Sequence, residues 1–503
     1  MRFGTAARLL VALAACGVGL AAADGKEINA ATDRAFSFGP MAIGQAKDLD
    51  HARAEGLGVV PASPLDTYLG GVLAKLLAGS PVTQVPARVY VRASSEWSAK
   101  STADANIYVS LGILLRLDNE DEVAALLAHE ASHVILGHAN SDVVQGVQQR
   151  AIQLSALAVD AQRALADATG NSGVAGGLPG GGNPRVEDQS RALLLNTTLL
   201  SPSWTRGQER AADRLGTDLL VRAGYSPHGM ATLLQKQKSF ETERAANPQA
   251  SSLDQQLMGS DVNQQGQRRV TEATAKYGAT SELFGTLAGA ALNRTQDWAA
   301  RQADEGSRSH PKTKERIADV QAYIAQEYGD KAARELQVES WEAAKEADGT
   351  VDILENYIAA IEAKGKLADG DIAAARTLAK AGLSGPTMTH AYPNYVDAAV
   401  QVAGGSTAQA LADYEAALSG PEPAGAIYTG ASTLLLATGQ RDRALEVMEA
   451  GYARLQEPPS LTVPLIRTYR LLGRQADADR LAADCAMRWP TMQSLCTGEA
   501  AGR

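Results

Sequence analysis

The chain has 503 residues, 45% of them hydrophobic and 5% aromatic, and 57 acidic against 47 basic residues give a net charge of −10. This length suggests about two to four domains, and we expect two. The acidic balance disfavours nucleic acid and anionic membrane surfaces as partners, so protein partners are expected. Abundant alanine with few aromatic residues is typical of helices packed through small side chains, which predicts a mainly α fold.

The first 23 residues have the pattern of an export signal. An apolar run at 9–20 follows a short basic region and is too short to span a membrane, and residues 21–23 offer an A-x-A cleavage site. Residues 13–16 also resemble a bacterial lipobox, in which Cys16 would carry a lipid anchor. Both alternatives stay open, and both send the protein out of the cytosol.

One helix and two strands are predicted before the middle of the chain. The motif Ser63-Pro64 opens an amphipathic helix that ends before Gly79. Residues 87–94 alternate as a strand does, and a second strand-like run, NIYVSLGIL, starts at Asn106. These runs predict a small strand pair in front of the segment that carries the chemistry.

The next predicted helix contains the motif H-E-x-x-H. Asn119 and Glu122 predict a capping box at its start. His129 and His133 stand four residues apart, so both imidazoles lie on one helix face and can bind one zinc ion. Glu130, beside a ligand, is placed to act as general base toward the attacking water. A chance match is expected only about 0.01 times in a chain with seven histidines.

The third ligand is expected from a later segment. His138 lies about 140 degrees around the helix from His133 and cannot join the same ligand face unless the helix ends first, so we do not expect it to bind the metal. The metzincin pattern, which needs Gly at Leu136 and His at Ala139, is not present. The glycine-rich residues 169–185 predict a disordered loop, with a mobile flap over the cleft as the alternative.

A predicted helix from Arg206, ending at Gly224, offers carboxylates for such a site. Glu209 and Asp213 are four residues apart and share one helix face. One of them can complete a His-His-Glu zinc site, and the other can hydrogen-bond a liganding imidazole. The alternative is a solvated charged face, because arginines are interleaved with both acids.

These motifs together resemble one family of zinc peptidases. HEASHVILGH, the helix ERAADRLG, and Ser309-His310-Pro311 followed by Arg316 are similar to the family of the CAAX prenyl protease, HtpX and BepA, over roughly residues 60–325. The resemblance implies a zincin-like gluzincin domain of α+β type with a small sheet. It places one zinc ion on His129, His133 and Glu209, the general base at Glu130, and Asp213 in the E-x-x-A-D position.

One predicted strand is a candidate for substrate binding. In zinc endopeptidases an edge strand beside the metal often holds the substrate backbone by strand addition, and Asn106–Ser110 is the candidate for this role. An interior strand with no free edge is the alternative. Many members have Asn-Ala just upstream of the second strand, where this chain has Ser98-Ala99.

The segment S-H-P is implied to lie near the cleft, at a loop-to-helix junction. Two roles are open for His310: as a donor it would stabilise the oxyanion, and as a neutral imidazole it would fill the fourth position on zinc and restrain the enzyme. We favour the self-inhibitory role. Between about 240 and 300 we expect an inserted helical arm, to which no function is assigned.

From about residue 330 the sequence predicts helical repeats. Gly405, Gly439 and Gly473 are each 34 residues apart, as are three alanines five residues further on. This period is typical of tetratricopeptide repeats, which stack into a superhelix with a concave binding surface. An irregular helical domain is the alternative. Cys485 and Cys496 form an even pair and favour a disulfide in an exported protein, against two buried thiols.

We therefore expect a signal at 1–23, a peptidase domain at 24–329 and a repeat domain at 330–503. The favoured function is an exported zinc metalloendopeptidase of the soluble, BepA-like branch. It would cleave protein or unfolded substrates in outer-membrane protein quality control in a Gram-negative periplasm, free or lipid-anchored through Cys16. The alternative is a chaperone or assembly adaptor that works through its repeats with a latent zinc site. The intact Glu130 favours the enzyme.

Overall fold

The computed structural model describes residues 41–55, 58–78, 85–140, 204–246, 313–329 and 336–502. The predicted export signal with Cys16, the glycine-rich loop, His310 and most of the predicted arm at 240–300 lie outside these ranges. In the described ranges, helices surround one small sheet, which confirms the mainly α prediction. None of the described helices combines the length and the apolar character needed to cross a membrane.

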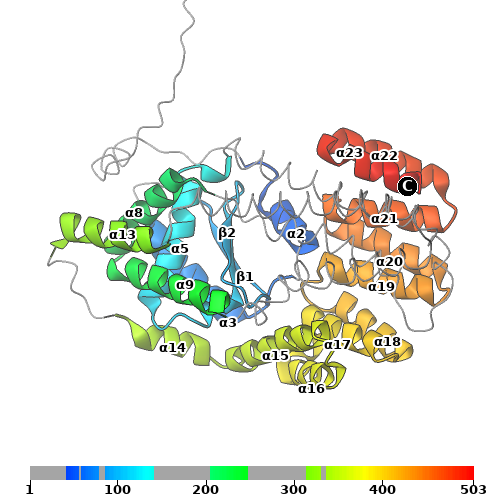
Figure 1. Ribbon diagram of the computed structural model, residues 1–503, viewed down its shortest axis with the longest axis horizontal. Coiled ribbons are helices and arrows are strands. Elements are labelled where there is room, and N and C mark those ends of the chain that lie inside the picture. Colours follow the sequence, from blue (N-terminus) through cyan, green and yellow to red (C-terminus); the bar gives the residue numbers. More distant parts are fainter. Residues whose placement is uncertain are drawn as a thin grey trace, which may run out of the picture.

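The first part of the chain gathers helices around a three-stranded sheet, drawn in blue to green in Figure 1. Its elements are α2 Gln45–Glu55, α3 Ser63–Ala78, β1 Arg88–Arg92, β2 Ala99–Ser101, β3 Asn106–Ser110, α4 Leu111–Leu114, α5 Glu120–Ile135, η1 His138–Asn140, α8 Arg206–Arg222, α9 His228–Ala246 and α13 Thr313–Glu327. Helix α5 packs against α3, α8, α9 and β2, so it lies at the centre of this part.

The sheet corrects the strand prediction. Its order is β1-β3-β2, with β1 parallel and β2 antiparallel to β3. Asn106–Ser110 is therefore the central strand, buried along its whole length, and the expectation of an edge strand there was wrong. The run NIYVSLGIL also leaves the sheet after Ser110, because the Ser110 hydroxyl accepts from Ile113 N at 3.2 Å and caps α4. In the described part of the chain, no strand pairs with the outer edge of β2.

Helix α5 begins nearly as predicted. The Asn119 side chain accepts a hydrogen bond from Glu122 N at 2.9 Å. The Glu122 carboxylate accepts from Asp118 N at 2.8 Å rather than from the cap residue itself, so the capping box is displaced by one residue. The acids of the first turn are buried and bonded: Asp121 accepts from Ser226 N at 2.7 Å, and Glu120 accepts from the Tyr225 hydroxyl at 2.8 Å. These bonds join the start of α5 to the loop after α8.

The second part of the chain is a row of antiparallel helix pairs, drawn in yellow to red in Figure 1. The glycines at 405, 439 and 473 have φ of 76°, 78° and 77° and stand in the turn inside successive pairs. Ala410, Ala444 and Ala478 are fully buried at the helix contacts. The elements are α14 Val338–Glu346, α15 Thr350–Ala368, α16 Ile372–Gly382, η4 Gly385–Thr389, α17 Ala391–Ala403, α18 Thr407–Ser419, α19 Gly425–Ala437, α20 Arg441–Arg454, α21 Pro459–Leu471, α22 Gln475–Arg488, η5 Pro490–Met492 and α23 Gln493–Ala500.

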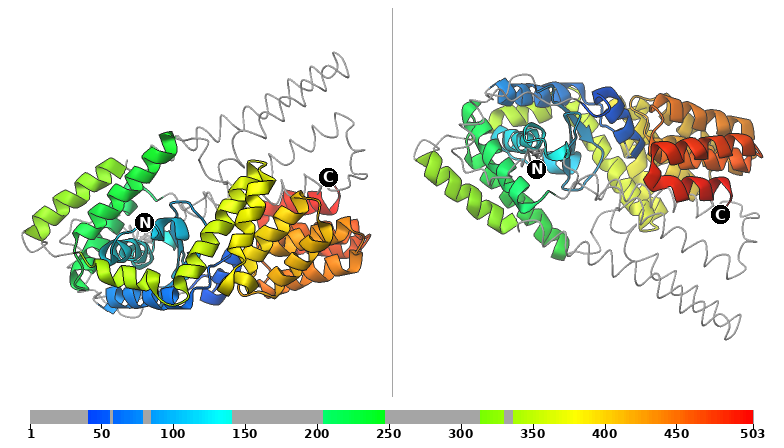
Figure 2. Two further views of the ribbon diagram at one scale, coloured as in Figure 1. Left: turned by 90° about the horizontal axis from the view of Figure 1, so that it is seen from below. Right: turned by 90° about the horizontal axis from the view of Figure 1, so that it is seen from above.

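The two parts are joined by packing. One hydrophobic core runs from the sheet and α5 through Trp341 of α14 into α15, α16 and α17. Trp341 is 1% exposed, and its indole N–H donates to Leu117 O at 2.8 Å. Helix α2 lies between the sheet and the last repeats, as the two views of Figure 2 also show, and it contacts α19 and α21. The apolar core thus includes residues from both sides of the domain boundary predicted at residue 330.

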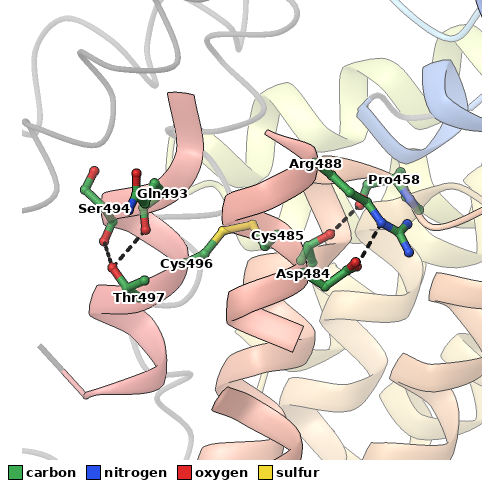
Figure 3. Close-up of a disulfide and its surroundings, with 9 residues drawn as sticks. Pro458, Asp484, Cys485, Arg488, Gln493, Ser494, Cys496 and Thr497 are labelled. Atoms are coloured by element: carbon green, nitrogen blue, oxygen red, sulfur yellow. Dashed lines mark hydrogen bonds and ion pairs between the residues drawn. A yellow bond between two sulfur atoms is a disulfide. The ribbon is translucent and has the colours of Figure 1, made fainter. Parts of the chain in front are cut away.

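The last helix is held by a disulfide. Cys485 of α22 and Cys496 of α23 are bridged, which confirms the predicted pair over two free thiols (Figure 3). Arg467 of α21 adds a bidentate bond to the buried Glu499 of α23, at 2.9 and 2.6 Å. These two links add to the apolar packing of the eight-residue α23 against α21 and α22.

Candidate metal centre

Three side chains from two helices converge at the C-terminal half of α5. The Nε2 atoms of His129 and His133 are 3.1 Å apart. Glu209, in the first turn of α8, brings one carboxylate oxygen to 3.7 Å from His129 Nε2 and the other to 3.9 Å from His133 Nε2. All three potential ligand atoms lie within 4.8 Å of one another, and all three residues are buried or nearly so. Two imidazoles and one carboxylate form a donor set that zinc prefers.

Asp213 and Arg316 hold the outer side of this cluster. Asp213, one turn after Glu209, lies 3.0 Å from His129 Nδ1, the nitrogen that faces away from the other ligands. Arg316 of α13 makes two bonds to the Asp213 carboxylate, at 2.8 and 2.6 Å, and approaches Glu209 at 2.9 Å. A single guanidinium therefore orients both acids of α8.

Burial and ion pairing act in opposite directions on these groups. Burial alone would raise the pKa of Asp213, but the Arg316 guanidinium and His129 outweigh it and hold that pKa well below its ordinary value. Burial would likewise lower the pKa of His129, but Asp213 and Glu209 raise it above the ordinary value. Asp213 is thus an anion fixed beside an imidazole, an arrangement that orients liganding histidines.

His133 has different neighbours. Its Nδ1 lies 2.9 Å from Nδ1 of His138, which stands in η1 just after α5. Trp204, directly before α8, stacks on the His133 ring with centroids 4.4 Å apart and an angle of 20°. Burial, followed by the charge of His129, lowers the pKa of His133 well below its ordinary value, and the same two causes lower the pKa of His138 to about 4. Both rings are therefore neutral near pH 7.

Glu130 is buried at 5% exposure next to the cluster. Its Oε2 atom has no hydrogen-bond partner among the described residues. Buried polar atoms normally have such a partner, so this one calls for a ligand. Burial raises the pKa of Glu130 to about 6, although His129 and Ser101 of β2 act to lower it. An orphaned carboxylate oxygen beside two histidines and a glutamate fits a site that holds a metal ion and a water molecule.

The structure brings together most of the residues singled out in the sequence. His129, Glu130, His133, Glu209 and Asp213 meet at one place, whereas His310 lies outside the described residues. Sequence reasoning missed three neighbours: it assigned no role to Arg316, set His138 aside and did not consider Trp204. A basic residue in S-H-P-x-x-x-x-R was the only available signal for Arg316.

Comparison with known proteins places this site in a family. The sequence profile of peptidase family M48 matches residues 69–324, which is half of the chain. The chain is similar to the beta-barrel assembly-enhancing protease of Yersinia pestis, at 28% identity over 34% of this chain and 32% of that protein. It is also similar to metalloprotease LoiP of Escherichia coli, at 30% identity over 36% of this chain and 61% of that protein. A third relative is mitochondrial metalloendopeptidase OMA1 of Schizosaccharomyces pombe, at 26% identity over 35% of this chain and 45% of that protein. The match therefore spans a third to three fifths of these relatives.

Proposed function

The chain belongs to peptidase family M48, and on that premise we propose that it is a zinc metalloendopeptidase that cleaves protein substrates. The convergence of His129, His133 and Glu209 carries the proposal, because three buried ligands from two helices fit one zinc ion. A bound zinc ion would polarise the scissile carbonyl and lower the pKa of water. No other residue pattern singled out in the sequence offers hydrolytic chemistry.

We assign the remaining steps to the side chains around the ligands. Glu130 accepts a proton from the attacking water through its unpartnered Oε2 and returns it to the leaving amine. Its pKa is raised to about 6, which makes the carboxylate a stronger base. Because this pKa is still below 7, Glu130 remains ionised at neutral pH. Asp213 holds His129 in the tautomer that directs the Nε2 lone pair inward, and Arg316 keeps Asp213 ionised and pairs with Glu209.

The substrate backbone is proposed to bind along β2, which replaces β3 as the candidate edge strand. The outer edge of β2 has no strand partner in the described ranges, and Ser101 of β2 is close enough to act on the pKa of Glu130. A chain added to this edge would therefore pass beside the general base. His310 keeps its proposed role as a self-inhibitory ligand of zinc or an oxyanion donor.

We further propose that the repeats form a tetratricopeptide-like superhelix that binds protein substrates or outer-membrane assembly partners. The 34-residue spacing of the turns and the buried alanines support this reading. A relative named for beta-barrel assembly favours envelope quality control. The Cys485–Cys496 disulfide favours an oxidising compartment such as the periplasm. Within that compartment the protein would be either free or attached to the membrane by a lipid anchor at Cys16.

Two isosteric substitutions test the assignment. Glu209→Gln should lower zinc occupancy sharply, because it removes a ligand, whereas Glu130→Gln should keep zinc and lose about 10²–10⁴-fold in turnover. Glu243→Gln, at an exposed position of α9, is the control and should match the wild type. The measurements are metal content after dialysis and cleavage of an unfolded protein. Full zinc retention by Glu209→Gln would overturn the ligand assignment, and undiminished cleavage by Glu130→Gln would overturn the base.

A further inference from the structure

The two candidate ligand histidines have different partners on their far sides. His129 presents Nδ1 to the Asp213 carboxylate at 3.0 Å, and His133 presents Nδ1 to another imidazole, His138, at 2.9 Å. The Nε2 atoms of both face each other and Glu209. Each ring therefore has one nitrogen toward the proposed metal and one toward a fixed partner.

Metal binding decides where the protons lie. A nitrogen that binds zinc offers its lone pair, so a neutral His133 bound through Nε2 carries its proton on Nδ1. That N–H points at His138 Nδ1, which must then accept, and the proton of a neutral His138 must lie on its Nε2. The short contact is consistent with only one proton between the two nitrogens.

The end of α5 explains how a residue five positions away reaches this place. Gly137 has φ of 66°, a left-handed conformation that ends the helix, and its N–H donates to Val134 O at 3.1 Å. The chain then turns into η1, which carries His138 back toward the ring of His133. Trp204 contacts both rings, with centroids 4.4 Å from His133 and 5.8 Å from His138. The angle around an ideal helix therefore does not apply to His138.

A neutral acceptor suits the charge of the site. Three carboxylates, Glu130, Glu209 and Asp213, already face one guanidinium, Arg316, and a divalent ion would balance the remaining charge. A fourth carboxylate behind His133 would add a buried negative charge without a partner, which is costly. An imidazole accepts the same hydrogen bond without that charge.

We propose that His138 is a positioning residue that accepts the Nδ1–H of His133 and so fixes its tautomer and ring orientation for zinc. This inference rests on the proposed zinc site. Partners of this kind typically contribute 10–100-fold to metal affinity.

The test compares three substitutions in the full chain by zinc competition with a chelating dye. His138→Asn keeps an acceptor near the position of Nδ1, so its zinc affinity should stay within about threefold of the wild type. His138→Leu keeps volume without an acceptor, and His138→Ala removes both, so each should bind zinc about 10–100-fold more weakly. A packing role would instead favour Leu over Asn. Circular dichroism of the metal-free proteins checks that all three fold.

A second measurement uses the wild type alone. In zinc-loaded protein labelled with ¹⁵N-histidine, long-range ¹H–¹⁵N spectra should show the proton of His133 on Nδ1 and that of His138 on Nε2. A proton on Nδ1 of His138, or unchanged zinc affinity in His138→Leu, would overturn the inference and leave the zinc site standing. A wild type that binds no zinc would overturn the proposed function and this inference together.

Discussion

Among the residues that are not themselves proposed zinc ligands, Arg316 contacts both acids of α8. Its three bonds neutralise two buried acids, Asp213 and Glu209, and it is itself 9% exposed. Removing one partner of a buried ion pair leaves an uncompensated charge. We predict that Arg316→Ala lowers the free energy of unfolding of the metal-free protein by about 3–5 kcal/mol, measured by urea denaturation.

The chain offers a matched control between the same two helices. Arg210 of α8 pairs with Asp319 of α13 at 2.8 Å, but both side chains are about half exposed. An exposed pair contributes about 0–1 kcal/mol, so Arg210→Ala should change stability little. Arg316→Lys should recover only part of the loss, because one ammonium cannot replace a bidentate fork. Equal losses in the two alanine variants would contradict this account.

The sequence identified site residues that lie close together along the chain and missed the role of those whose contacts are distant in sequence. His129, Glu130 and His133 are four residues or fewer apart, so helical geometry alone places them, and the same holds for Glu209 with Asp213. Arg316 meets Asp213 across 103 positions, and no periodic pattern encodes that contact. His138 was set aside because helical spacing turns it away from the ligand face unless the helix ends first, and the sequence did not show that the helix ends before it, as the turn at Gly137 does.

At the scale of elements, the sequence predicted the position of a strand in the chain better than its position in the sheet. The strand-like run from Asn106 predicted β3, but such a run does not show which edges of the strand are paired. The missed strand β2 has three residues, too few for a period to be visible, and its pairing converts the expected edge strand into the centre of the sheet. The helices at 63–78 and 206–222 were predicted well, since caps and glycine stops are local signals.

A buried acid pair in the repeats leads to a second prediction. Asp397 of α17 and Asp413 of α18 are 6% and 7% exposed, and one oxygen of each has no hydrogen-bond donor in the described chain. A proton on one carboxyl would supply that donor. Burial raises the pKa of Asp413 to about 6, and the neighbouring Asp397 adds to the shift.

The sign of the pH effect follows from this raised pKa. The folded state binds the proton more tightly than the unfolded state, so the pair's contribution to stability is fully present below about pH 4 and is lost as pH rises through about 6. Asp413→Asn supplies an N–H donor at every pH. We predict that it raises the free energy of unfolding by about 1–2 kcal/mol at pH 8 and has little effect at pH 4.5.

Denaturant midpoints at the two pH values measure this difference. Glu446→Gln, at an exposed position of α20, is the control and should shift neither midpoint. A destabilised Asp413→Asn at pH 8 would show that the pair is ionised and held by other contacts.

At the scale of the molecule, helix α2 connects two regions far apart in sequence (Figure 1). On one side Asp48 accepts hydrogen bonds from Asn106 and the Tyr108 hydroxyl of β3, each at 2.7 Å. On the other side His51 lies 3.0 Å from Gln456 O, and Arg53 pairs with Glu422. Gln456 and Glu422 are non-glycine residues with φ of 58°. This conformation is strained, so surrounding contacts must maintain it. Helix α2 thus sets the repeats against the sheet.

The backbones of the two regions approach closely at Gly425, the first residue of α19. A Cβ atom there would lie 2.4 Å from Ala54 O and 3.0 Å from Ala54 C, both backbone atoms that cannot rotate away. We therefore predict that Gly425→Ala displaces the end of α2 and lowers the free energy of unfolding by about 1–3 kcal/mol. Hydrogen exchange should rise at the amides of α2 in particular. Gly71→Ala, in α3, meets no atom within 4 Å and should leave exchange unchanged and stability equal or slightly higher. Unaltered exchange in α2 of the Gly425 variant would show that this helix does not fix the two parts of the molecule to each other.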